Sequence, residues 1–245
     1  MKTKLLTAVA VVGSLCLGAS ADFTPFSGSI GYMTAWELNG TGDGPGAWQF
    51  ADFWGVPDLK TLTSDDLTFE LFPNISGYVN SLTGANIDRS FWTDSSDGGV
   101  TAGPNGNKWL AASTFRELTL GAGETVASLD FSVSAFNLDS SYTLTAYIQT
   151  LDPLAGYGVS AIDSAVISGM VGTTTLSIGS VVPLEEGHIL QIGYQMAGIN
   201  ANQTDDWGSA TATLENVSVV PEPATLGLLG IFGGAMLFFR RRFKR

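Results

Sequence analysis

Few residues of this sequence are of the types that carry out acid–base or nucleophilic catalysis. The chain has one histidine, His188, and one cysteine, Cys16. Histidine is the commonest general acid or base in enzymes, but no Ser/Asp partner pattern points at His188, so we predict a structural or surface role for it. A Ser-His-Asp triad stays open because its members need not be adjacent in sequence, although the G-x-S-x-G elbow of one version is absent. Structural zinc sites use cysteine and histidine ligands, so no zinc is expected.

Paired carboxylates form a second chemical signal. They occur at Asp65-Asp66, Glu185-Glu186 and Asp205-Asp206. A glycosidase needs two carboxylates roughly 5–9.5 Å apart across a cleft, whereas adjacent residues of a strand point to opposite faces. We therefore interpret these pairs as solvated turns.

Calcium is the metal that these residue types suit best, because it takes carboxylate, carbonyl and amide oxygens as ligands. Asp94, Asp97 and Asn105, all in one Gly/Asp/Asn-rich loop, are the candidate ligands. Asp43 and Asp205-Asp206 are the other candidates. The alternative is an acidic loop that holds no metal, and no other cofactor is expected.

Tryptophans beside polar loops are the candidate sugar-binding residues. The C–H face of a sugar packs on an indole ring, while Asn and Asp side chains bind its hydroxyl groups. Trp92 and Trp109 flank the polar loop of residues 94–106, and Trp207 follows the polar run of residues 202–206. The alternative is that these side chains fill the interior of the fold.

The elements that must position these residues are β-strands. Apolar residues alternate with polar ones along most of the body, and period two indicates strands. The predicted strands are Leu67–Phe72, Ser128–Phe136, Tyr142–Ile148, Val159–Ile167, Thr173–Ile178, His188–Tyr194 and Ala210–Val219. A parity shift at Glu215-Asn216 predicts a bulge, and Asp52–Thr61 is a weak helix candidate. We predict an all-β fold, an antiparallel β-sandwich of jelly-roll type.

Both ends of the chain have sequence features of segments that interact with a membrane. Residues 1–21 have a basic start, an apolar run and Ala19-Ser20-Ala21, the features of a secretory signal peptide cleaved after Ala21. Residues 224–239 are uncharged and mostly apolar, and residues 240–245 contain five cations. We predict a transmembrane helix over 224–239 with its basic tail in the cytoplasm, a β-sandwich body over 22–219 and a sorting segment over 220–245.

The C-terminal segment resembles the PEP-CTERM sorting signal. Pro221-Glu222-Pro223, a glycine-containing apolar helix and the cluster Arg240-Arg241-Arg242 occur in the order of that family. The resemblance implies that these six residues form a sorting signal, in which Pro221, Glu222 and Pro223 are recognised by an exosortase, a membrane cysteine peptidase. It also implies that the tail is removed and that the body reaches the cell surface or the extracellular matrix. The two prolines favour an extended backbone, which a protease cleft can bind by strand-like pairing.

Segments of the body resemble uncharacterised PEP-CTERM proteins, which in turn resemble galactose-binding-like or carbohydrate-module jelly rolls. The segments are Trp54–Leu62, Leu67–Tyr78, Asn105–Ala112, Tyr142–Pro153 and Gln191–Asn202. No activity comes with that resemblance, which therefore bears on the fold.

Charge separates the body from its ends. The whole chain has a formal charge of −12, but residues 22–221 keep four of the 11 cations and 22 of the 23 acids, which gives −18. Such a body lacks the basic surface of a nucleic-acid binder. We expect a non-enzymatic protein, exported across the inner membrane and transiently anchored there, with the exosortase and the secretion machinery as partners and weak binding of an exopolysaccharide. The alternatives are a carbohydrate-active hydrolase and a purely structural matrix component.

Overall fold

The computed structural model describes residues 20–21, 28–63, 67–74, 92, 106–179, 184–201 and 206–221. Among these residues no helix is long and apolar enough to cross a membrane. The predicted transmembrane helix at 224–239, the basic tail and residues 1–19 of the predicted signal peptide lie outside the described residues.

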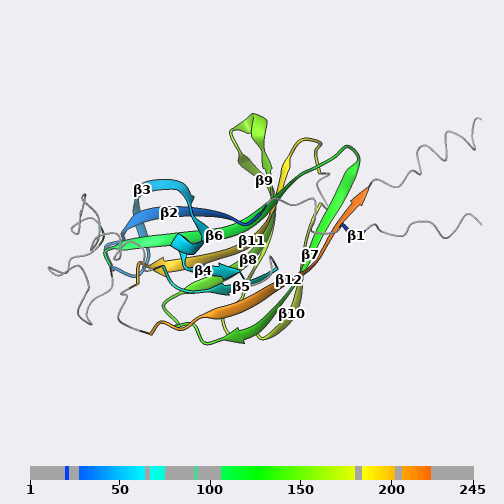
Figure 1. Cartoon of the computed structure of the whole chain (residues 1–245). Helices are drawn as coiled ribbons and strands as arrows, with labels where there is room; N and C mark the ends of the chain where they lie inside the picture. The colour runs from blue at the N-terminus through cyan, green and yellow to red at the C-terminus, as the bar shows by residue number, and fades with distance from the viewer. Residues whose placement is uncertain are drawn as a thin grey trace, which may run out of the picture.

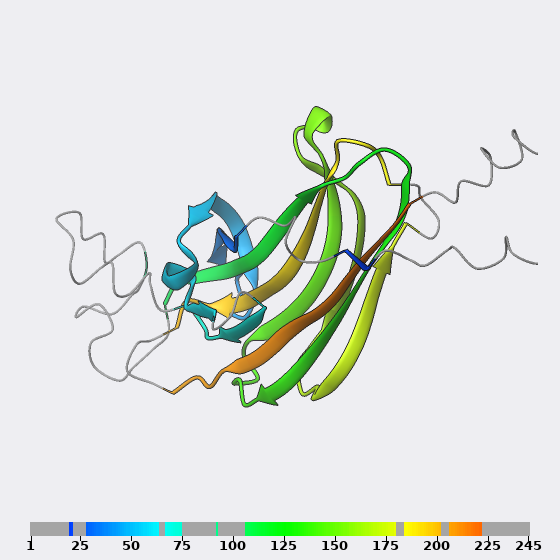
Figure 2. The same ribbon diagram turned by 45° about the vertical axis from the view of Figure 1, so that its right-hand side comes forward.

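The described residues form two antiparallel sheets that face one another (Figures 1 and 2). Sheet A has the order β10-β7-β12-β5-β4, with β1 also paired to β12. Its strands are β1 (Ser20–Ala21), β4 (Thr61–Thr63), β5 (Thr68–Leu71), β7 (Glu124–Phe136), β10 (Gly172–Ile178) and β12 (Ala210–Pro221).

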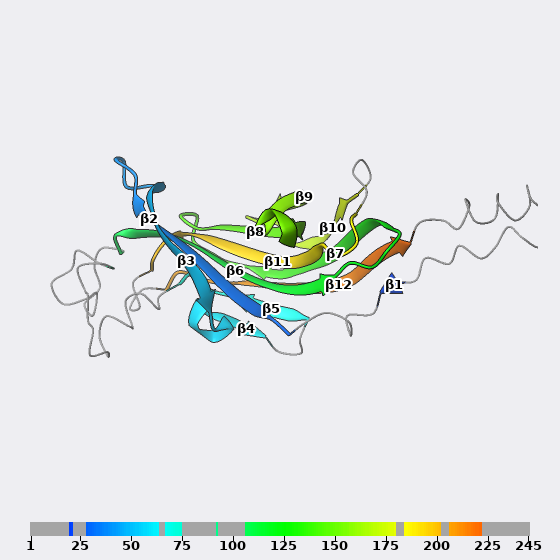
Figure 3. The same ribbon diagram turned by 90° about the horizontal axis from the view of Figure 1, so that it is seen from above.

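Sheet B has the order β3-β2-β6-β11-β8-β9. Its strands are β2 (Ile30–Leu38), β3 (Pro45–Trp54), β6 (Lys108–Thr119), β8 (Thr143–Asp152), β9 (Gly158–Val166) and β11 (Ile189–Ile199). Figure 3 shows the edge strands β3 and β9 on either side of β6, β11 and β8. The two-sheet antiparallel sandwich predicted from the sequence is confirmed, and its architecture is consistent with a jelly roll.

The core lies between the two sheets, where most of the predicted strands bury their apolar parity. The edge strand β9 is the exception, because none of its residues is buried. Tyr194 of β11 is fully buried, and its ring makes edge contacts with Phe69 of β5 at 5.4 Å and Phe131 of β7 at 6.3 Å between centroids. A second, smaller cluster lies at the β2–β3 end and includes Met33, Leu59 and Leu110, among others. Aromatic rings of both sheets therefore join the layers.

The predicted strands are all present, and the bulge is confirmed by a register shift between Leu214 and Asn216 of β12. The helix expected over Asp52–Thr61 is wrong. Asp52 lies in β3, which ends at Trp54. A single 3-10 turn, η1 (Val56–Leu59), follows, and Thr61 begins β4. Pro57 is the second residue of that turn, and Lys60 closes it in the left-handed conformation (φ 59°), so the chain reverses instead of continuing as a helix.

The first and the last described strand meet at one corner, and the first, β1, falls within the predicted signal peptide (residues 1–21). Ser20 pairs with Ser218 and Ala21 with Val217, which places β1 along the last residues of β12. Figure 1 shows this corner at the end of the sandwich opposite the β2–β3 hairpin.

Candidate functional site

A hollow of about 750 Å³ lies on the outer face of sheet B, the face turned away from sheet A. Alternation places it there, because Leu190, Ile192 and Tyr194 of β11 point into the core and the residues between them point outward. We call this hollow the groove. It is lined by Tyr32, Thr34, Phe53, Ser113, Phe115, Glu117, Tyr147, Gln149, Leu151, Gly156, Tyr157, Ile189, Gln191 and Gln195.

The groove crosses the sheet from β3 to the β8–β9 connection. Phe53 of β3 and Tyr157 of the connection are its terminal aromatic residues, and their exposed fractions are 68% and 61%. Phe53 is held by an edge contact with Tyr32, at 5.2 Å between ring centroids. From β3 to β8 there are four strand spacings, or about 19 Å at roughly 4.8 Å each. The groove is therefore long enough for an extended ligand.

A glycine makes room for the aromatic floor of the groove. Gly193 of β11 lies between Phe115 of β6 and Tyr147 of β8 in the register of the sheet. A Cβ atom at Gly193 would come within 2.2 Å of the Thr114 carbonyl oxygen and 2.7 Å of Phe115 Cβ. Phe115 and Tyr147 are themselves buried, so the floor is packed and pre-formed.

A ladder of amide side chains crosses the floor from strand to strand. Gln149 Nε2 donates to Gln191 Oε1 at 2.6 Å, and Gln191 Nε2 donates to Glu117 Oε1 at 2.7 Å. Gln195 Nε2 donates to Ser113 Oγ at 3.1 Å. These bonds fix the orientation of the side chains, so that the groove presents polar groups in defined positions beside its aromatic rings.

Tyr147 is a neutral phenol throughout the physiological range. Burial raises the pKa of its hydroxyl well above the ordinary value, and the negative charge of Glu117 raises this pKa further, while a hydrogen bond with Ser113 acts in the opposite direction. Because the hydroxyl keeps its proton, the floor gains no second negative charge from this residue.

The β8–β9 connection brings Tyr157 to the groove through an unusual backbone. The 3-10 turn η2 (Pro153–Ala155) begins at Asp152, whose Oδ1 accepts from Leu154 N at 2.7 Å and whose carbonyl accepts from Tyr157 N at 2.8 Å. Gly156 and Tyr157 then both have positive φ, 68° and 64°. A non-glycine residue in this region is strained, and Figure 1 shows the hairpin that carries it projecting above the sheet beside β9.

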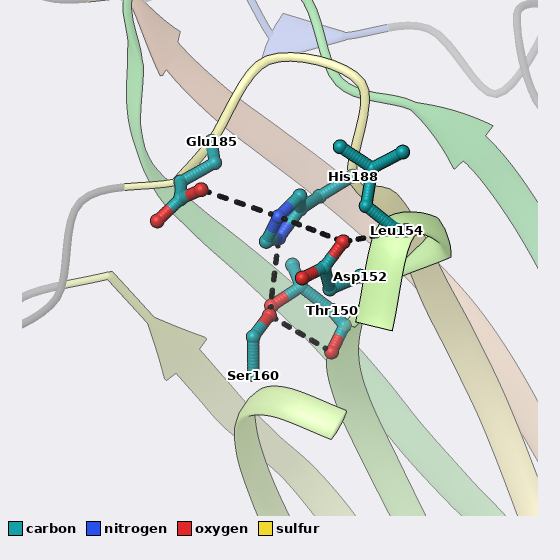
Figure 4. A network of polar contacts seen from close by, with 6 residues as sticks. All are labelled: Thr150, Asp152, Leu154, Ser160, Glu185 and His188. Atoms are coloured by element: carbon teal, nitrogen blue, oxygen red, sulfur yellow. Dashed lines mark hydrogen bonds and ion pairs between the residues drawn. The ribbon is translucent and has the colours of Figure 1, made fainter. Parts of the chain in front are cut away.

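His188 belongs to a polar cluster that anchors the same hairpin (Figure 4). Its Nδ1 lies 3.1 Å from Ser160 Oγ, and its Nε2 faces Glu185 Oε2 at 3.4 Å and Asp152 Oδ1 at 3.8 Å. Ser160 is the extra residue at a register shift between β8 and β9, and its Oγ also contacts the carbonyl and the hydroxyl of Thr150. His188 is buried, so the cluster joins β8, β9 and the turn before β11 as a structural clamp.

The structure does not bring the three predicted sugar-binding tryptophans together. Trp92 packs edge-on against Phe50 and Trp54 of the smaller core cluster. Trp207 packs against the main core, with its ring 5.7 Å from that of Tyr142. Trp109 lies on the outer face of sheet B, where it pairs with Trp36 of the neighbouring strand β2. It is not among the residues that line the groove.

The groove residues were not predicted from the sequence, because they come from five separate segments of it. One signal could have found some of them. Once Leu190, Ile192 and Tyr194 are assigned to the core, Gln191 and Gln195 must lie on the opposite face.

The predicted calcium ligands Asp94, Asp97 and Asn105 lie outside the described residues, and that site stays a prediction. Within the described part of the chain no three His, Cys, Asp or Glu side chains are grouped so as to hold a metal ion. Of the six residues of the predicted sorting signal, Glu222, Pro223, Arg240, Arg241 and Arg242 also lie outside the described residues, and Pro221 is placed at the end of β12.

Comparison with known proteins bears on the C-terminal end of the chain. The family model described as the PEP-CTERM protein-sorting motif matches residues 219–242. The chain carries a PEP-CTERM sorting motif. None of the curated proteins matches it. Among solved structures, the chain is similar to TmCBM61, determined in complex with beta-1,4-galactotriose, with 10% sequence identity and a TM-score of 0.33 over 82% of this chain and 91% of that one.

Proposed function

We propose that this is an exported cell-surface or extracellular-matrix protein, sorted by an exosortase through its PEP-CTERM motif, and that the groove on sheet B binds a glycan. The motif at residues 219–242 supports the route. The observation that carries the binding function is the groove itself, in which aromatic rings at both ends flank a row of ordered amide groups.

The chemistry of the groove suits sugars better than other ligands. A sugar presents C–H faces that pack on aromatic rings and hydroxyl groups that need donors and acceptors. Phe53 and Tyr157 offer exposed rings, and the Gln149–Gln191–Glu117 ladder offers amide and carboxylate groups between them. A span of about 19 Å favours an oligosaccharide or polysaccharide over a single sugar.

Charge favours a neutral glycan. Of the residues that line the groove, Glu117 has a carboxylate and none is Lys or Arg. Residues 22–221 carry a formal charge of −18, which repels uronate or sulfate groups at low ionic strength. We therefore expect neutral chains to bind in preference to anionic ones.

Binding without turnover is the function that this geometry supports best. The two-carboxylate mechanism of most glycosidases needs an acid and a second carboxylate across the bond, and the groove lining offers Glu117 alone. A hydrolase on this scaffold and a spacer without ligand remain the two competing functions.

Calorimetric titration of the full-length chain in detergent separates these functions. Neutral, uronate-containing and amino-sugar oligosaccharides are titrated in turn, and a labelled neutral polysaccharide is followed for release of fragments. Heat with a neutral oligosaccharide and no fragments is the expected result. Folded protein that gives no heat with any of them would indicate a spacer, and fragments that Glu117→Gln abolishes would indicate a hydrolase.

A further inference from the structure

Three tryptophans lie side by side on the outer face of sheet B, at its β2–β3 end. Trp36 of β2 pairs with Trp48 of β3 on one side and with Trp109 of β6 on the other. Cross-strand partners project from the same face and have their Cβ atoms about 4.5–5.5 Å apart. We call these three residues the tryptophan row. It crosses three adjacent strands of the sheet (Figure 3).

Alternation directs the row away from the core. Ala35 of β2 and Leu110 of β6 belong to the smaller core cluster. Their sequence neighbours Trp36 and Trp109 therefore point to the opposite face, where they are half-buried. Trp48 lies on the edge strand β3 and is 63% exposed. The row therefore presents indole surface to the solvent.

A β-bulge gives Trp48 its outward direction. Phe50 lies opposite Ala35 and packs on the smaller core cluster, and in a regular strand Trp48 would point to the same side as Phe50. The register shifts between Ala35 and Trp36, and Gln49 is the extra residue of β3. This shift sets Trp48 opposite Trp36 instead. The bulge, a feature common beside functional sites, thus exposes a tryptophan that regular pairing would direct to the core.

The tryptophan row continues the groove along the same face. Tyr32 and Thr34 of β2 line the groove, and Trp36 follows them at the next outward position. Thr34 pairs with Ala51 and Ala111, so small side chains lie between the rings of the groove and those of the row. From Tyr32 to Trp36 is four residues along β2, or about 13 Å at roughly 3.3 Å per residue. A ligand that extends out of the groove along β2 therefore reaches the row.

The chemistry of this face suits a neutral sugar chain. No residue of the row is charged, and none of its small neighbours Thr34, Ala51 and Ala111 is charged. Indole rings pack on the C–H faces of sugars, and this contact needs no charge on the ligand. Rings on successive strands, about 4.8 Å apart, offer such contacts to consecutive sugar units. Tryptophans are also frequent at protein interfaces, but continuity with the groove favours a glycan.

We propose that the tryptophan row is a second contact surface for the glycan that occupies the groove, so that the protein binds long neutral polysaccharide chains more tightly than short oligosaccharides. This inference rests on the proposed glycan-binding function. A short oligosaccharide fills the groove, whereas a longer chain continues past Tyr32 and covers Trp36 and Trp48. Affinity therefore rises with chain length until the row is covered.

Trp48→Ala tests the row with little risk to the fold, because the side chain is exposed on an edge strand. A tryptophan presents roughly 250 Å², of which 63% is exposed at Trp48. A sugar that covers half of this exposed surface buries about 80 Å², which corresponds to roughly a thirtyfold change in Kd. We expect Trp48→Ala to raise the Kd for long chains by between about tenfold and about thirtyfold, with little change for short chains that do not reach the row.

Calorimetric titration of the full-length chain in detergent measures this difference. Neutral cello-, manno-, xylo- and galacto-oligosaccharides are titrated from the disaccharide upwards, followed by the parent polysaccharides. Val166→Ala is the matched control, because Val166 is 53% exposed on the other edge strand of sheet B and does not line the groove. Phe53→Ala should weaken the binding of short and long chains alike, since Phe53 lines the groove.

The outcomes separate this inference from the proposed function. If the parent binds long chains no more tightly than short ones, or if Trp48→Ala binds long chains as tightly as the parent does, the inference is wrong while binding in the groove stands. If the parent binds neither short nor long chains, the proposed glycan function fails and the inference fails with it. If Trp48→Ala lowers the particle mass in light scattering and leaves polysaccharide binding unchanged, the row is an interface between copies of the chain, which also overturns the inference.

Discussion

Replacing Tyr157 by glycine should weaken glycan binding and at the same time stabilise the folded chain. The tyrosine ring stands at one end of the groove, and its backbone has a φ of 64°. Glycine adopts this conformation without the steric penalty that other residues incur. The substitution therefore removes a binding surface and a strained residue together, so affinity and stability should change in opposite directions.

The expected loss of affinity follows from the exposed area of the ring. A tyrosine presents roughly 200 Å², and 61% of Tyr157 is exposed, which leaves about 120 Å² for a ligand. A sugar that covers half of this area buries about 60 Å², which at roughly 25 cal/mol per Å² is about 1.5 kcal/mol, or about a tenfold increase in Kd.

The expected gain in stability is smaller. A left-handed non-glycine residue costs roughly 1–2 kcal/mol, and the greater freedom of glycine in the unfolded chain offsets about 0.5–1 kcal/mol of this cost. The net gain is about 0.5–1 kcal/mol, which for a domain of this size raises the Tm by roughly 1–4 °C.

Calorimetric titration with a neutral oligosaccharide and thermal unfolding measure the two quantities on one preparation. Tyr157→Ala should lose affinity to the same extent without gaining stability, because alanine keeps the strained φ. Leu154→Ala is the matched control, since Leu154 is 99% exposed on the same hairpin and does not line the groove. Wild-type affinity in Tyr157→Gly, or a Tm more than about 2 °C below that of the parent, would show that this assignment of Tyr157 is wrong.

Three further substitutions test the floor and the core. Gly193→Ala should destabilise the chain by about 1–3 kcal/mol in chemical denaturation and weaken glycan binding, because the new Cβ would displace Phe115. Unchanged affinity would show that Phe115 does not belong to the binding site. Tyr194→Phe should raise stability by about 1 kcal/mol, because the buried Tyr194 hydroxyl has no hydrogen-bond partner among the described residues; a loss of stability would reveal a partner such as a buried water. Asn200→Ala should lower the free energy of unfolding by about 2–4 kcal/mol. The fully buried Asn200 side chain accepts from Lys108 N at 3.0 Å and donates to the Trp92 carbonyl at 2.9 Å. A loss below about 1 kcal/mol would contradict this role.

How far the fold could be predicted depended on how many faces of each strand are covered. Strands such as β7 and β12 alternate between core and outer positions, so period two reveals them. β6 is buried on both faces along most of its length, with eight of its twelve residues buried. β2 has apolar or aromatic residues at both parities, among them Met33 and Trp36. Their sequences show no alternation, because neither face is simply solvated.

The tryptophans show why the site was harder to predict than the fold. Trp92 and Trp207 stand beside polar loops in sequence, but their rings pack on Phe50 and Tyr142. Proximity to a polar loop along the chain does not specify which way a side chain points. That depends on the packing of segments that are distant in sequence.

The sequence by itself determined the sorting motif and the layer architecture, because both appear as local patterns that a short window of residues contains in full. Only the tertiary structure decided where the groove that we propose as a binding surface lies. Gln149, Gln191 and Glu117 form one ladder because β8, β11 and β6 are neighbours in sheet B. Strand order arises from long-range pairing and core packing, and no local pattern encodes it.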